Sequence, residues 1–286
     1  MPDLDSCKKE EIKFPMTPAI STVFLLSLLI FVNGVESSYM YENSYDDDYK
    51  GCREEREMEI TEHYLDNDLN KNEFLRSAWN KAKNQWNAST PYVLDLNTSI
   101  AIRGYTSASF HSELNSAVQD GVTLVEKYHY RSIHFLLTKA IQTLNQGNCI
   151  RAYRGVSVEI RPREGEAFRF GRFASASRNI MVALNFKNAT VFNMTTCHAA
   201  DISNYSLYRT EAEVLIPPYE VFIVKESNGR YVTLESKNIT VNYRCWPLNG
   251  SPGQNTIPNN AGPSLTPLTV LHLLLGFFTS PFFWKT

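Results

Sequence analysis

The chain has 286 residues, of which 43% are hydrophobic and 20% are charged, and its formal net charge is −2. This composition is typical of a globular protein, and the length allows one large domain or two small ones. The slight negative charge provides no basic surface that would gather a polyanion, so the sequence argues against a nucleic-acid-binding role.

The N-terminal segment, residues 1–36, has the pattern of an N-terminal extension with a targeting signal rather than of the folded domain. An apolar run spans Ile20–Val32, and three lysines between residues 8 and 13 precede it. A basic region followed by a short apolar run is typical of a secretory signal peptide and is too short for an ordinary membrane span. We expect cleavage between residues 34 and 37, and an uncleaved anchor is the alternative.

Residues 37–247 form the expected folded domain, and its first half predicts helices. Apolar residues recur every three or four positions over residues 72–86, 107–118 and 128–144, the spacing of one helix face. Gly147 is the expected stop of the third helix.

The second half of the domain predicts strands. Short runs rich in β-branched and aromatic residues are Ala152–Gly155, Ala167–Phe173, Thr190–Cys197, Glu213–Ile216, Glu220–Val224, Tyr231–Glu235 and Ile239–Tyr243. Helices followed by strands predict an α+β fold, in which a helical N-terminal half packs on a β-rich core. No strand is followed by G-x-G-x-x-G and no P-loop is present, so the two common nucleotide-binding motifs are excluded.

The C-terminal end has the pattern of a lipid-anchor signal. Residues 248–264 are small and polar, and residues 265–286 are mostly apolar with only Lys285 charged. A small-residue site, a polar spacer and an apolar tail predict a glycosylphosphatidylinositol (GPI) anchor at the spacer and removal of the tail. A retained membrane helix is the alternative.

Cysteines and glycosylation sequons are consistent with export. Cys52, Cys149, Cys197 and Cys245 lie in the predicted domain, and four cysteines in an oxidising compartment suggest two disulfides with three possible pairings. Because no C-x-x-C spacing exists and the histidines are scattered, we expect no metal site. N-x-S/T sequons, the acceptors of N-glycans, begin at Asn87, Asn97, Asn188, Asn193, Asn204, Asn238 and Asn249.

Three short motifs in the strand-rich half carry the functional information. They are Tyr153-Arg154-Gly155, Ser175-Ala176-Ser177 and Glu211-Ala212-Glu213, in this order. Each is common by chance, but together they resemble the arginine, serine, Glu-x-Glu signature of the arginine-specific, vertebrate ecto-mono-ADP-ribosyltransferases. Further segments similar to that family are Tyr45–Cys52, Phe135–Ile141, Arg169–Phe173 and Val214–Glu220. The similarity covers residues 45–245.

The resemblance implies an enzyme that uses NAD as substrate and needs no metal. It implies cleavage of the nicotinamide–ribose bond through an oxocarbenium-like state and transfer of ADP-ribose to arginine. Glu213 would stabilise the positive charge that develops on the ribose, and Glu211 would orient the acceptor arginine and help to deprotonate it. In extended chain these two side chains would share one face, and their charges would raise one another's pKa.

The remaining site residues follow from the same resemblance. Arg154 would bind the NAD phosphates or ribose, and Gly155 would let the backbone approach the cofactor. Ser175 would form a hydrogen bond near the ribose and the catalytic glutamate. Ala176 replaces the threonine common in the family, which we expect to be tolerated because it faces away. Phe186 would stack on nicotinamide; a place in the apolar core is the alternative.

The resemblance also implies the disulfides Cys52–Cys245 and Cys149–Cys197. It places the protein on the outer face of the plasma membrane, held by a lipid anchor or secreted, with arginine-bearing surface or secreted proteins as acceptors. A NAD glycohydrolase, in which water replaces arginine, is the leading alternative, and Glu211 argues against it because hydrolysis needs no second carboxylate. A catalytically inactive surface antigen or binding protein on the same fold is the other.

Overall fold

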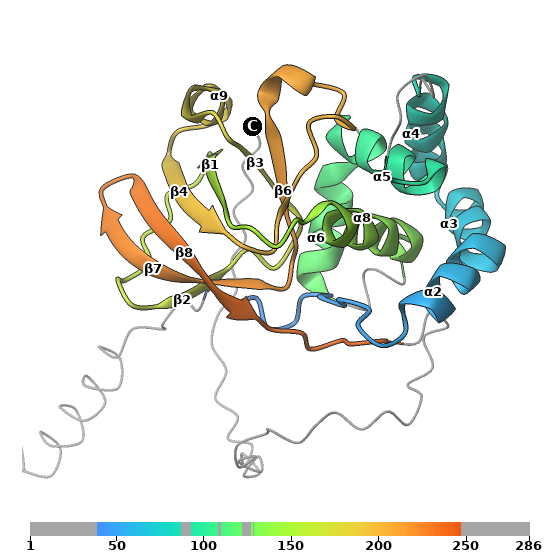
Figure 1. The fold of residues 1–286 in the computed structure, drawn as a ribbon, viewed down its shortest axis with the longest axis horizontal. Helices are drawn as coiled ribbons and strands as arrows, with labels where there is room; N and C mark the ends of the chain where they lie inside the picture. The colour runs from blue at the N-terminus through green and yellow to red at the C-terminus, as the bar shows by residue number, and fades with distance from the viewer. Residues whose placement is uncertain (1–38, 87–92, 108–109, 122–126, 128, 247–286) are drawn as a thin grey trace, which may run out of the picture.

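A computed structural model describes residues 39–86, 93–107, 110–121, 127 and 129–246, with helices on one side and a twisted mixed sheet on the other (Figure 1). The described helices of the N-terminal half are α2 (Arg53–Glu59), the π-helical η1 (Ile60–Tyr64), α3 (Leu65–Lys71), α4 (Glu73–Asn84), α5 (Leu96–Thr106), α6 (His111–Asp120) and α8 (Arg131–Leu144). The predicted α+β architecture is confirmed. The predicted signal peptide, spacer and apolar tail lie outside the described residues.

The helices predicted over residues 72–86 and 128–144 correspond to α4 and α8. The side chain of Asn72 accepts a hydrogen bond from the N–H of Leu75 and so caps the start of α4. Leu75 and Trp79 then lie on its buried face. Helix α8 ends at Leu144 with Asn145 as its C-cap, and Gly147 follows in the left-handed region at φ 76°.

Helix α5 is not predicted by the apolar pattern, and the predicted helix over residues 107–118 begins later than expected. Thr98 and Ser99 are fully buried in α5 and interrupt its apolar face. Asp95 caps the helix by accepting bonds from the N–H and hydroxyl of Thr98, at 2.9 Å and 2.7 Å. Ser107 is the C-cap of α5, so α6 starts only at His111. The helices between Arg53 and Lys71 are likewise absent from the predictions.

The sheet has eight strands in the order β2-β7-β8-β4-β1-β3-β6-β5. The strands are β1 (Ile150–Val156), β2 (Ala167–Arg169), β3 (Ala174–Ser177), β4 (Thr190–Thr196), β5 (Ala200–Asp201), β6 (Glu213–Ile216), β7 (Glu220–Asn228) and β8 (Tyr231–Ile239), with α9 (Ile180–Phe186) between β3 and β4. All neighbours pair antiparallel except β4 and β8.

Two of the predicted strands differ from the structure. Of the run Ala167–Phe173, only Ala167–Arg169 forms a strand, β2; the chain turns at Gly171, whose φ of 61° favours glycine, and β3 begins only at Ala174. The run Ile239–Tyr243 is not a separate strand, since β8 ends at Ile239.

Strand β6 lies between the two apolar cores and thereby places Glu213, the last residue of the acidic motif. Val214 and Ile216 belong to a cluster built by the strands, whereas Leu215 belongs to the larger cluster built mainly by the helices. A strand buried on both faces reads as a continuous apolar run. Glu213 opens this strand at the boundary between the helical half and the sheet.

The two ends of the domain are joined by an acidic segment and a disulfide. Asp46 forms a buried ion pair of 2.7 Å with Arg169, and Asp47 accepts bonds from the backbone N–H groups of Cys245 and Trp246, both at 2.9 Å. Cys52 is bonded to Cys245 and Cys149 to Cys197, which are the pairs that the resemblance implies.

Candidate active site

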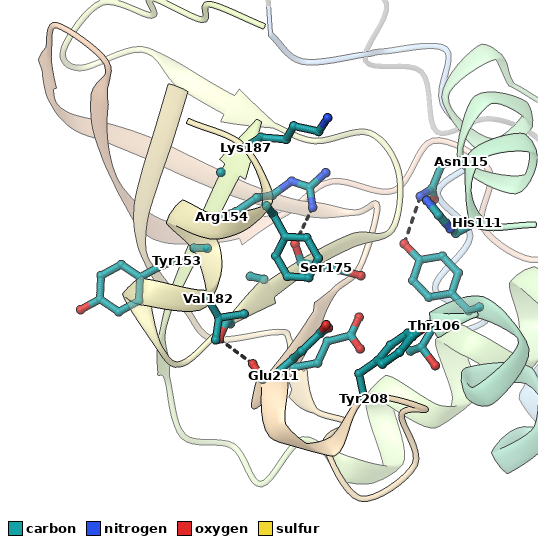
Figure 2. Close-up of a pocket in the computed structure, with 17 residues that line it drawn as sticks. Thr106, His111, Asn115, Tyr153, Arg154, Ser175, Val182, Lys187, Tyr208 and Glu211 are labelled. Atoms are coloured by element: carbon teal, nitrogen blue, oxygen red, sulfur yellow. Dashed lines mark hydrogen bonds between the residues drawn. The ribbon is translucent and has the colours of Figure 1, made fainter. Parts of the chain in front are cut away.

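A cavity of about 500 Å³ lies between the helical half and the sheet. Its walls come from α5, α6, β1, β3 and α9 and from the segment before β6 (Figure 2). Arg154, Ser175, Glu211 and Glu213 all border it, so the structure brings together the catalytic residues that the three sequence motifs predict.

The register of β3 against β6 places hydroxyls beside the carboxylate of Glu213. Ser177 pairs with Glu213, and Ser175 pairs with Leu215, so these side chains lie on the same face. Ala176 belongs to the apolar cluster built by the strands and is also one of the residues that line the cavity. Ala176 was expected to face away from the site, whereas it packs in this cluster and borders the cavity as well.

Glu213 is the buried member of the acidic pair, with only 6% of its surface exposed. Its Oε2 accepts a hydrogen bond of 2.9 Å from the hydroxyl of Ser206. Burial raises the pKa of Glu213, and hydrogen bonds from Ser175 and Ser206 act in the opposite direction. Burial thus disfavours the ionised form of this carboxyl group, and hydrogen bonds from two hydroxyls partly offset that cost.

Glu211 reaches the cavity by a route different from the one expected. It ends the 3-10 turn η2 (Arg209–Glu211), and Ala212 then adopts the left-handed conformation, with φ 47° and ψ 51°. The expectation that the pair lies on one face of extended chain is therefore wrong, because a turn separates the two glutamates. The hydroxyl of Ser177 donates to the Glu211 carbonyl at 2.6 Å and fixes this turn.

The expected mutual effect of the two charges is present for the pKa of Glu213, whereas the shift of Glu211 has burial as its cause. Burial raises the pKa of Glu211, the more exposed member of the pair. For Glu213 the charge of Glu211 raises the pKa further, but this contribution is smaller than that of burial. Desolvation, rather than mutual repulsion, is the main reason that both carboxyl groups are shifted.

Arg154 projects from β1 toward the Ser175 end of the cavity (Figure 2). Its Nη1 donates to the backbone carbonyl of Ser175, and the guanidinium lies 5.9 Å from the ring centre of Phe170. Burial lowers the pKa of Arg154 to about 10, so the group remains charged at neutral pH. Its Nε is buried and has no hydrogen-bond partner among the described residues.

Gly155 is required for a reason that the sequence did not predict. A Cβ at this position would lie 1.9 Å from the carbonyl oxygen of Lys187 and 2.4 Å from that of Ala183. The close backbone approach that we expected is therefore made by the end of α9 against β1. This packing brings Phe186 to the cavity, where it is 57% exposed. The alternative that Phe186 belongs to the core is wrong.

The helical wall supplies residues that sequence reasoning missed. Tyr105, Thr106, His111 and Asn115 border the cavity, and Thr106, His111 and Asn115 lie across it from Arg154 (Figure 2). The amide of Asn115 donates to the Tyr105 hydroxyl at 3.0 Å, and that hydroxyl donates to the carbonyl of Phe173 at 3.1 Å. Asn115 Oδ1 is buried and has no partner in the described part of the chain. Its polar side chain on the buried face of a predicted helix was the available sequence signal.

A second cavity of about 230 Å³ adjoins the first and shares Arg154, Gly155 and Lys187 with it. Arg172 also borders this cavity. Three basic side chains therefore surround adjoining spaces, an arrangement suited to a ligand that carries phosphate groups.

Of the predicted sequons, Asn188, Asn204 and Asn238 are exposed, and Asn97 and Asn193 are half-buried. Those at Asn87 and Asn249 lie outside the described residues. Within the described ranges, no group of three or more His, Cys, Asp or Glu side chains is arranged to hold a metal ion.

Comparison with known proteins identifies the family. The family model described as NAD:arginine ADP-ribosyltransferase matches residues 38–242. The chain belongs to this family. The T-cell ecto-ADP-ribosyltransferase 1 of Mus musculus is 35% identical over 232 residues, which is 75% of this chain and 80% of that protein. The ecto-ADP-ribosyltransferase 5 of Homo sapiens is 35% identical over 81% of this chain and 88% of its own.

Solved structures of a mono-ADP-ribosyltransferase share the fold. The crystal structure of the eukaryotic mono-ADP-ribosyltransferase ART2.2 is similar with a TM-score of 0.67 and 32% identity, covering 72% of this chain and 97% of that one. A mutant of the same protein in complex with NADH gives a TM-score of 0.67 at 30% identity and the same coverage.

Proposed function

We propose that this protein is a NAD-dependent protein-arginine mono-ADP-ribosyltransferase. The observation that carries the proposal is the meeting of Glu211 and Glu213 with Arg154 and Ser175 in one cavity. A relative from Gallus gallus, 35% identical over 75% of this chain, is named NAD(P)(+)--arginine ADP-ribosyltransferase 2. The family and the constellation of side chains support the same reaction.

The cavities suit NAD in their polar groups. Arg154 Nε and Asn115 Oδ1 are buried polar atoms without partners among the described residues, a state that ordinarily calls for a ligand or water. Arg154, Arg172 and Lys187 would attract the pyrophosphate. Phe186 offers an exposed ring at the cavity for the nicotinamide to stack on.

Glu213 would act on the donor half of the reaction. Cleavage of the nicotinamide–ribose bond leaves positive charge on the ribose, and nicotinamide departs as a neutral group, so no general acid is needed. A buried carboxylate stabilises this charge more strongly than one in water would. Ser175 and Ser206 hold the carboxylate, and Ser175 would also lie near the ribose.

Glu211 would act on the acceptor half. An arginine guanidinium is protonated at ordinary pH and is a weak nucleophile. The carboxylate of Glu211 can accept its hydrogen bonds, direct one nitrogen toward the ribose carbon and receive a proton. The raised pKa of Glu211 favours that last step.

A NAD glycohydrolase is the second candidate, and the presence of Glu211 in the cavity favours transfer over it. An inactive binding protein is disfavoured because the arginine, serine and both glutamates are retained. The test is incubation of the full-length protein, produced in animal cells, with labelled NAD and peptides that carry arginine or lysine at one matched position. We expect label on the arginine peptide alone. Free ADP-ribose without labelled peptide would indicate hydrolysis, and no NAD cleavage would indicate a binding protein.

We also propose that the protein resides at the cell surface through a GPI anchor. Relatives are named ecto-enzymes, and the chain ends in an apolar stretch after a polar spacer. No helix in the described ranges is long and apolar enough to cross a membrane.

Phosphatidylinositol-specific phospholipase C is therefore expected to release the protein from intact cells, because it cuts between the lipid and the glycan. The measurement is immunoblotting of the medium and the cells after digestion. If the protein stays on the cells while a control GPI-anchored protein is shed, the tail is retained as a membrane segment.

A further inference from the structure

Ser206 occupies a fixed position between the acceptor turn and the catalytic carboxylate. It lies in the segment that connects β5 to η2 and is only 1% exposed. Its own N–H donates to the carbonyl of Ile202 at 3.0 Å, and its hydroxyl accepts from the N–H of Tyr208 at 3.1 Å. The hydroxyl donates its single proton to Glu213 Oε2 at 2.9 Å.

We propose that Ser206 is a positioning residue that holds the carboxylate of Glu213 toward the cavity and couples its orientation to the turn that carries Tyr208 and Glu211. The inference rests on the proposed transferase function. Neither the sequence motifs nor the paired strands include Ser206, whose contact with Glu213 arises only in the folded chain.

The hydrogen-bond pattern distinguishes this role from simple packing. A hydroxyl has one proton to donate, and the Tyr208 N–H occupies a lone pair of Ser206, so the remaining proton is directed at Glu213. A charge-assisted bond of this kind is about twice as strong as a neutral one. Because Tyr208 borders the cavity beside Glu211, displacement of the turn would move the donor to Glu213.

The electrostatic setting gives the role a measurable consequence. Burial raises the pKa of Glu213, and the bond from Ser206 opposes that shift. The charged and titratable groups that act on the carboxylate are Arg154 from β1, Glu211 from η2 and Tyr105 from the helical wall. His111 borders the same cavity. Since Ser206→Ala leaves these groups in place, the loss of its hydroxyl makes the folded Glu213 harder to ionise.

The test compares three variants of the full-length glycoprotein. Ser206 is also the third residue of the sequon at Asn204, so Ser206→Ala removes both the hydroxyl and the sequon. Ser206→Thr keeps both, and Asn204→Gln removes the sequon alone. NAD cleavage is measured by nicotinamide release as a function of NAD concentration and pH.

We expect Ser206→Ala to lower kcat about tenfold or more, on the scale of a hydrogen bond to a charged group, with little change in KM for NAD. The acid limb of kcat/KM should move to higher pH. Ser206→Thr should retain most of kcat and the original acid limb, and Asn204→Gln should behave as the unmodified protein. A Ser206→Ala variant as active as Asn204→Gln, or one whose activity falls without movement of the acid limb, would overturn the proposal.

A second measurement is independent of activity. A double-mutant cycle of Ser206→Ala and Glu213→Ala, read by thermal unfolding at pH 7.5, should show effects that are not additive, because each change removes the same bond. Additive effects would overturn the contact itself. If the unmodified protein cleaves no NAD but the cycle is not additive, the proposed function fails and the Ser206–Glu213 contact stands.

Discussion

Glu213→Gln is expected to lower both NAD cleavage and arginine transfer by at least about a hundredfold, the usual scale for loss of a key electrostatic group. The amide keeps the size of the side chain and can still accept a hydrogen bond from the Ser206 hydroxyl. It lacks the negative charge that would stabilise the oxocarbenium-like state. Because both outcomes of the reaction pass through that state, both should fall together.

The measurement is nicotinamide release and label transfer from the same reaction. Glu235→Gln is the matched control, since Glu235 is an exposed glutamate on β8 that pairs with Lys225 at the surface. The control removes the same charge far from the cavity and should leave both rates unchanged. Near-normal nicotinamide release by Glu213→Gln would show that the catalytic carboxylate lies elsewhere.

The pH dependence of the unmodified protein follows from the raised pKa of Glu213. In the proposed mechanism the ionised form is the active one, so activity should fall as the pH drops through this raised pKa. The contribution of Glu213 to the free energy of unfolding depends on pH in the opposite direction. The folded state holds the proton more tightly than the unfolded chain, so this contribution to stability is complete below the unfolded pKa and is lost as the pH rises through the folded pKa. Glu213→Gln should therefore unfold at the same or a higher temperature at pH 7.5.

The sequence predicts correctly those elements in which apolar side chains face the core and polar side chains face solvent or a helix end. Helix α4 has a clear apolar face and an Asn72 cap, and β6 is an apolar run because both of its faces are buried. Helix α5 escapes prediction because Thr98 and Ser99 are buried within it. Their polar groups are satisfied by contacts, such as that with Asp95, which no pattern of hydrophobicity reveals.

Some residues of the candidate site could likewise be predicted from the sequence, and others could not. Arg154, Ser175 and Glu213 are predicted because short motifs carry them. Asn115 and Lys187 reach the cavity from α6 and from the chain after α9, and only the packing of helices on the sheet shows this. The left-handed Ala212 shows why spacing alone misplaced Glu211. A Glu-x-Glu pair is consistent with a strand or a turn, and the bonds of Ser177 and Arg178 to this segment select the turn.

Glu211→Gln is expected to convert the protein from a transferase into a NAD glycohydrolase. The carboxylate of Glu211 stands on η2, more exposed than the buried Glu213, so an acceptor that enters the cavity would meet it first. The amide cannot accept two charge-assisted bonds from a guanidinium, nor can it receive a proton from it. Donor cleavage at Glu213 loses only a neighbouring charge that was raising its pKa.

The readout is the ratio of ADP-ribose on an arginine peptide to free ADP-ribose in one reaction. We expect this ratio to fall by about an order of magnitude or more, with a much smaller fall in total NAD consumption, because only interactions with the acceptor are lost. Glu235→Gln again serves as the control for loss of one negative charge.

A parallel loss of both activities would place Glu211 in the NAD site, since cleavage would then depend on it as well. An unchanged ratio would mean that the acceptor is not held by this carboxylate, and arginine would lose its main support as the acceptor. A reduced ratio with NAD still consumed, in contrast, would show that the turn at Ala212 separates two carboxylates with two different tasks.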